Sequence, residues 1–153
     1  MKKTIQISGL IFLVVIVLIQ FVPVQRENPP SDSSQILIAP PPVQLILKRS
    51  CYDCHSHETV WPAYSQIAPI SWLVAHDVAE GRDHLNFSVW TDYSPEAQVY
   101  FKGQSLSEIE EKKMPLPVYL MMHQDAKISQ DDFDVLKAWV GEDEVEVVPQ
   151  GVQ

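Results

Sequence analysis

The sequence has 153 residues and a formal net charge of −9 at pH 7, and 46% of its residues are hydrophobic. This length allows one domain with additional segments, and the apolar content is sufficient for a modest core. The negative charge argues against nucleic acid as a partner, because nucleic-acid binding requires a basic surface. It suits a soluble partner with a basic face.

The N-terminal segment places Lys2 and Lys3 ahead of a long apolar run, which predicts a signal anchor over residues 1–25. No small residues in an A-x-A-like pattern follow the run, so an uncleaved transmembrane helix is favoured over a cleaved signal peptide. The residues from Ile5 to Val22 would form a helix of about 27 Å, just long enough for the hydrocarbon core of a bilayer. Since basic residues before a span stay in the cytoplasm, we expect a single-pass protein of the bacterial inner membrane whose remaining chain is periplasmic.

Residues 26–42 are rich in proline and serine and are expected to form an exposed tether with extended pieces. An apolar island, Gln35–Ile38, interrupts the tether and either packs on the domain or has no structural role. The domain itself is predicted over residues 43–141. Residues 142–153 are predicted to form an acidic tail.

Helical periodicity recurs through the predicted domain, and no segment has a convincing strand pattern, which predicts an all-α fold. The first two helices are expected over residues 43–49 and 69–82. A third begins at Ser94-Pro95, where a hydroxyl cap precedes a proline, and is expected to break near Gly103 and restart at Ser105 or Ser107. The last helix, residues 129–140, begins with a capping box formed by Ser129 and Asp132.

The two cysteines of the chain lie in Cys51-Tyr52-Asp53-Cys54-His55, directly after the first of these helices. C-x-x-C-H is the attachment motif of c-type haem. A redox dithiol of the thioredoxin type would need a βαβ context, and a structural zinc site would need four ligands. We therefore predict one covalently attached haem c, with Cys51 and Cys54 forming thioethers and His55 as the proximal iron ligand.

The methionines and histidines are the candidates for a sixth iron ligand, because cytochromes c typically bind the haem iron through His and Met. Met114 is the best placed, since it precedes a proline and therefore lies in an extended segment after a helix. His123 and His76 are the alternatives and would give bis-histidine ligation. An open sixth position is the remaining possibility.

Several sequence blocks resemble the bacterial haem-binding domain family, whose short members are relatives of cytochrome c. The matching blocks are Cys51–His55, Trp61–Pro69, Ser71–Val74, Gly81–Phe87, Met114–Tyr119 and Ala126–Ser129. The resemblance implies a mono-haem, helical, membrane-anchored and exported domain, and it implies no defined partner. The long Trp- and His-rich stretch between His55 and Ser94 departs from the common cytochrome c pattern.

These observations predict a cytochrome c-like protein that is not an enzyme and transfers single electrons to a redox partner that the sequence does not identify. A haem-based sensor with a weak or open sixth coordination site is the alternative function. A peroxidase is disfavoured, because no distal acid–base pair is evident.

Overall fold

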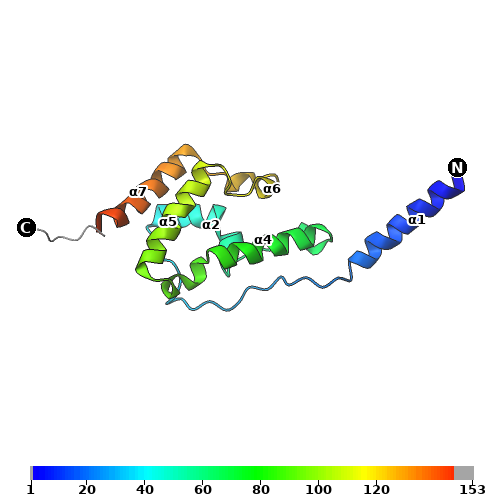
Figure 1. The fold of residues 1–153 in the computed structure, drawn as a ribbon, viewed down its shortest axis with the longest axis horizontal. Helices are drawn as coiled ribbons and strands as arrows, with labels where there is room; N and C mark the ends of the chain where they lie inside the picture. The colour runs from blue at the N-terminus through cyan, green and yellow to red at the C-terminus, as the bar shows by residue number, and fades with distance from the viewer. Residues whose placement is uncertain (1, 147–153) are drawn as a thin grey trace, which may run out of the picture.

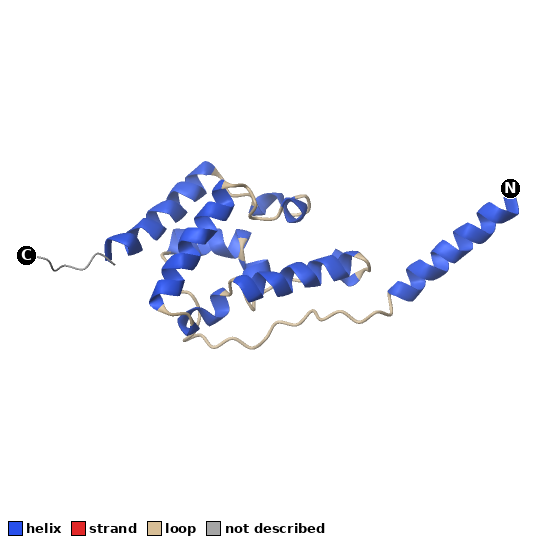
Figure 2. Ribbon diagram, viewed as in Figure 1, coloured by secondary structure: helices blue, strands red, loops and turns tan. Residues whose placement is uncertain are grey.

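The computed structural model describes residues 2–146, and within this range it contains helices and no strand (Figure 2). The α-helices are α1 (Lys2–Ile19), α2 (Pro41–Ser50), α3 (Tyr52–His55), α4 (Ile70–His84), α5 (Pro95–Glu110), α6 (Pro117–Leu120) and α7 (Gln130–Glu146). Short 3₁₀ helices are η1 (Ala63–Gln66), η2 (Phe87–Asp92) and η3 (Gln124–Ala126). The predicted all-α class is therefore confirmed.

Helix α1 lies apart from the other helices, at the end of a long connecting segment (Figure 1). The prediction of a transmembrane anchor was wrong: within residues 2–146, no helix has the length and apolar character needed to cross a membrane. Helix α1 ends at Ile19 and not at Val22, so its apolar part from Ile5 measures only about 22 Å, against a hydrocarbon core of about 30 Å. The predicted location in a bacterial inner membrane, with a periplasmic domain, depended on this anchor. The finding that overturns the anchor therefore overturns this prediction as well.

The segment between α1 and α2 contacts the helical domain instead of standing clear of it. The side chain of Gln20 makes two hydrogen bonds with the backbone of Ala68, at 3.0 and 3.1 Å. Further along, the Leu37 N–H donates to the carbonyl oxygen of Phe87 at 2.8 Å, and only 3% of Leu37 is exposed. The apolar island therefore packs into the domain.

Helix boundaries follow the local sequence signals at most positions. The Ser94 hydroxyl accepts a hydrogen bond from the Ala97 N–H and caps α5, and Ser129 and Asp132 form the predicted capping box at the start of α7. The predicted break near Gly103 is absent, because α5 is continuous and the Ser105 hydroxyl donates to the carbonyl oxygen of Phe101 within it. Helix α7 extends to Glu146, so the predicted acidic tail begins inside a helix; residues 147–153 lie outside the described range.

The hydrophobic core forms where α2 and the short helices meet α7. Its buried members are Leu37, Val43, Ile46, Leu47, Tyr52, Phe87, Trp90 and Leu136. Helix α5 packs against α7, and α3 packs against α4. These two pairs of helices face one another across a cavity that contains the predicted site.

Candidate functional site

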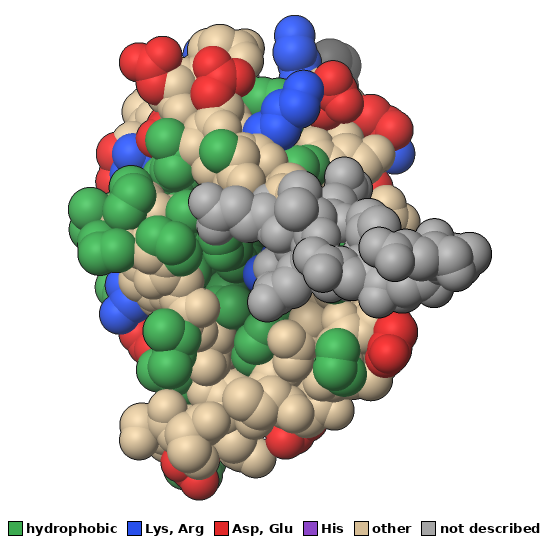
Figure 3. Space-filling model, turned by 90° about the vertical axis from the view of Figure 1, so that its left-hand side faces the viewer, with side chains coloured by type: hydrophobic (Ala, Val, Ile, Leu, Met, Phe, Trp, Pro, Cys, Tyr) green, Lys and Arg blue, Asp and Glu red, His purple; other side chains and the backbone are tan. Residues whose placement is uncertain are grey.

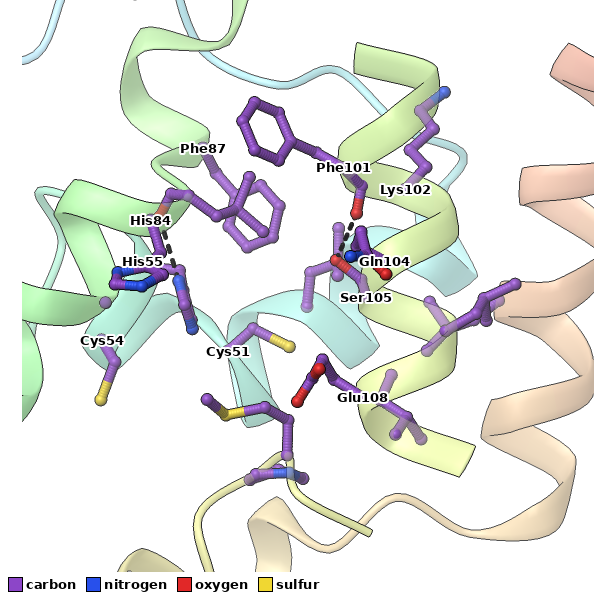
Figure 4. Close-up of a pocket in the computed structure, with 18 of the residues that line it drawn as sticks. Cys51, Cys54, His55, His84, Phe87, Phe101, Lys102, Gln104, Ser105 and Glu108 are labelled. Carbon is purple, nitrogen blue, oxygen red and sulfur yellow. Dashed lines mark hydrogen bonds between the residues drawn. The ribbon is translucent and has the colours of Figure 1, made fainter. Parts of the chain in front are cut away.

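A cavity of about 520 Å³ separates α3 and α4 from α5 and α7. Figure 4 shows Cys51 and His55 on one side of the cavity and Phe101, Ser105 and Glu108 of α5 on the opposite side. Its apolar walls include Leu47, Leu85, Phe87, Trp90, Leu106, Ile109, Leu136 and Trp139. The volume lies within the range of about 300–1,000 Å³ that proteins use to bind small molecules and cofactors.

Both cysteines line this cavity as free thiols. Cys51 lies between α2 and α3, and its N–H donates to the Leu47 carbonyl oxygen at 2.8 Å. Burial raises the pKa of the Cys51 thiol to about 12 and that of Cys54 to about 11. In the described part of the chain, no group of three or more His, Cys, Asp and Glu side chains could hold a metal ion.

The imidazole of His55 is oriented by the end of α4. Its Nδ1 atom lies 3.0 Å from the carbonyl oxygen of Leu85. A carbonyl oxygen only accepts hydrogen bonds, so Nδ1 carries the proton and Nε2 keeps its lone pair. Burial lowers the pKa of His55 and favours the neutral imidazole, which is the form that binds a metal.

The turn that carries the second cysteine packs directly against α4 at Gly81. A Cβ atom at Gly81 would lie 2.7 Å from the carbonyl oxygen of Cys54 and 3.0 Å from its Cβ atom. Glycine at this position lets the two backbones approach, and this approach places Leu85 beside His55.

Met114 lines the same cavity from the connection between α5 and α6. The chain leaves α5 through Lys112, which has a φ of +58°, and the Met114 N–H donates to the Glu108 carbonyl oxygen at 3.1 Å. Met114 therefore lies outside a helix, as its position before Pro115 predicts. Its role as an iron ligand stays a prediction.

The two histidine alternatives occupy different places. His76, on α4, lines the cavity, whereas His123 is not among the lining residues. The Nε2 atom of His123 lies 2.7 Å from the Tyr64 hydroxyl, and its ring stacks on Tyr119 with centroids 4.2 Å apart. The structure thus brings Met114 and His76 together with the cysteine motif and leaves His123 in an aromatic cluster.

Tyr119 is a site residue that sequence reasoning missed. It lines the cavity, and its hydroxyl donates to the Asp53 carboxylate, inside the cysteine motif, at 2.8 Å. Burial and this hydrogen bond raise the pKa of Tyr119, so the phenol stays protonated. No local signal predicts the contact, because 66 positions separate the two residues.

These residues fit a haem. Two thiols and a neutral imidazole lie at the edge of an apolar cavity, and a methionine sulfur is available from another segment. The arrangement offers attachment points, an iron ligand and apolar walls for a large planar ring.

Comparison with known families supports this fit. The chain matches the haem-binding domain family over residues 14–142, which is most of its length, and it belongs to that family. Among the curated proteins compared, none matches the chain. The solved structures gave no match either.

Proposed function

We propose that this member of the haem-binding domain family carries one covalently attached haem c in a cytochrome c-like helical domain and transfers single electrons. The observation that carries the proposal is the hydrogen bond from His55 Nδ1 to the Leu85 carbonyl oxygen, beside two free thiols in one cavity. When bound, haem supplies an iron that cycles between the ferric and ferrous states.

The residues of the cavity have distinct roles in this proposal. Cys51 and Cys54 hold the haem through thioether bonds, and His55 binds the iron through Nε2. Met114 would supply a thioether sulfur as the sixth iron ligand, and this ligand would raise the reduction potential relative to a second imidazole. The apolar walls exclude water from the site and favour the less charged iron state.

The proposed partner is a redox protein with a basic surface. Asp77, Glu80 and Glu108 line the cavity, whereas Lys102 is the single Lys or Arg among its described lining residues. Acidic side chains also lie around the margin of the face in Figure 3, among some Lys and Arg side chains and exposed hydrophobic ones. With a net charge of −9, such a surface speeds the encounter with a positively charged partner.

Replacement of Met114 by alanine tests the proposed ligation and separates electron transfer from ligand sensing. We expect the wild-type ferric protein to show the weak near-infrared sulfur-to-iron band and the Met114→Ala protein to lack it. Met121→Ala is the matched control, because Met121 is 74% exposed and does not line the cavity. A wild-type protein that lacks the band and whose ferrous form binds carbon monoxide rapidly would contradict the proposal and favour a sensor with a displaceable sixth ligand.

A further inference from the structure

The segment that carries Met114 is held to the cysteine motif by one side-chain hydrogen bond. The Tyr119 hydroxyl donates to Oδ2 of Asp53 at 2.8 Å, while Oδ1 of the same carboxylate accepts the Val60 N–H at 2.9 Å. Asp53 is thereby fixed by the loop that follows the motif. The bond spans the cavity edge, from α6 to the turn between the two cysteines.

The rest of this segment has few other restraints. Helix α6 has four residues and no fully buried side chain, with Tyr119 and Leu120 half-buried, and Met121 and Met122 are 74% and 66% exposed. At its start, the Met114 N–H is bonded to Glu108; at its end, His123 is bonded to Tyr64. Between these points, the described residues make one side-chain hydrogen bond to the haem-motif turn, through Tyr119.

We propose that Tyr119 is a positioning residue that keeps the sulfur of Met114 at the iron by tying α6 to Asp53. The proposal rests on the proposed function, in which Met114 is the sixth ligand. Tyr119 acts through Met114 and does not bind the iron. Without its hydroxyl, the segment leaves its bound position more often, and an external ligand competes more successfully for the vacated coordination site.

Tyr119→Phe tests this role, because phenylalanine keeps the ring that stacks on His123 and removes only the hydroxyl. The measurement is the affinity of the ferric holoprotein for imidazole, followed by loss of the sulfur-to-iron band. We expect Tyr119→Phe to bind imidazole at least about tenfold more tightly than wild type. A hydrogen bond to a charged group contributes enough free energy to change an equilibrium constant by that factor. A merely structural role for Tyr119 would lower the melting temperature and leave this affinity unchanged.

Tyr100→Phe is the matched control. Tyr100 lines the same cavity and is 60% exposed. Its hydroxyl accepts a hydrogen bond from the Gln104 side chain, which lies outside the cysteine motif. We expect its imidazole affinity to stay within about twofold of wild type, since an exposed hydrogen bond contributes little. Asp53→Asn changes the acceptor of the same hydrogen bond. We expect it to shift the imidazole affinity in the same direction as Tyr119→Phe. Two variants keep the test decisive if one of them fails to fold.

The outcomes separate this proposal from the proposed function. If wild type shows the sulfur band and neither Tyr119→Phe nor Asp53→Asn changes imidazole affinity, the positioning role is wrong and the ligation stands. If wild type lacks the band and Met114→Ala leaves the affinity unchanged, both proposals are wrong. In the Met114→Ala background, we expect the added Tyr119→Phe change to have no effect on imidazole affinity.

Discussion

The imidazole Nδ1 of His55 lies 3.0 Å from the carbonyl oxygen of Leu85, although 30 positions separate the two residues. Leu85 is the residue that follows α4, and its carbonyl is free to accept because α4 ends there. The orientation of the proposed iron ligand therefore depends on where α4 ends and on how closely it packs against α3.

The close contact between α3 and α4 predicts that Gly81→Ala destabilises the protein. The added Cβ would clash with the Cys54 backbone, and such overpacking typically costs about 1–3 kcal/mol. We expect a lower melting temperature and less bound haem per protein. Gly103→Ala is the control: nothing lies within 4 Å of a Cβ there, so alanine should stabilise α5 by up to about 1 kcal/mol. Equal melting temperatures for the two variants would contradict the close packing of α3 against α4 at Gly81.

The burial of Leu37 predicts that the segment before α2 is part of the folded domain. Leu37→Ala should lower the free energy of unfolding by about 2–5 kcal/mol, as expected for a truncated core leucine. Ile38→Ala should change it by less than about 0.5 kcal/mol, because the neighbouring Ile38 is 85% exposed. Urea unfolding measures both changes. Similar losses for both variants would show that the segment does not dock as described.

The raised pKa values of the two thiols predict slow alkylation in folded protein prepared without haem. Only the thiolate reacts, and burial moves the pKa of Cys54 from 9.0 to about 11. At pH 8, iodoacetamide should therefore label the folded protein at least about tenfold more slowly than the urea-unfolded protein. The rate should rise steeply toward pH 11. Equal rates in both states would show that the cavity forms only after haem attachment.

The capping box of α7 predicts a pH-dependent contribution to stability. Burial opposes ionisation of Asp132, but hydrogen bonds from Ser129 and Arg49 outweigh it and lower the pKa of the carboxyl. Because the folded pKa lies below the unfolded value of 3.8, the stabilisation is complete above about pH 4 and is lost as the pH falls through the folded pKa.

The corresponding variant is Asp132→Ala, which should cost about 1 kcal/mol at pH 7 and progressively less below pH 4. Asp134→Ala, at an exposed position on the same helix, should cost less than about 0.5 kcal/mol. A loss for Asp132→Ala that is the same at pH 7 and pH 3 would contradict the assigned role of the carboxylate.

Local signals predicted the helices of the domain well, and the errors have identifiable causes. The predicted break at Gly103 failed because one glycine costs a helix only about 1 kcal/mol, and α5 is held by Phe101 and Leu106 against the core. The anchor prediction failed because a count of apolar residues does not show where a helix ends, and α1 ends at Ile19.

The motif residues of the site were predictable, whereas their supporting contacts were not. C-x-x-C-H and the Met114-Pro115 pair are local patterns, and the structure places both at one cavity. The contacts of His55 with Leu85 and of Asp53 with Tyr119 join residues 30 and 66 positions apart. Such pairs depend on which loops meet after folding, so neither periodicity nor spacing indicates them. Arg49 and Arg82 likewise bind partners that local patterns do not indicate. Arg49 binds Asp132, Arg82 donates to the Ser56 carbonyl oxygen, and neither arginine lines the cavity.

A pyridine haemochrome spectrum of the protein matured with the c-type haem attachment machinery tests the central claim most directly. The wild type should give the spectrum of a haem with both vinyl groups saturated, and the haem should remain with the polypeptide after acid–acetone extraction. The Cys51→Ala/Cys54→Ala protein should lose its haem to the solvent in the same extraction. A wild-type protein that carries no haem, or that releases it like the double variant, would contradict the account.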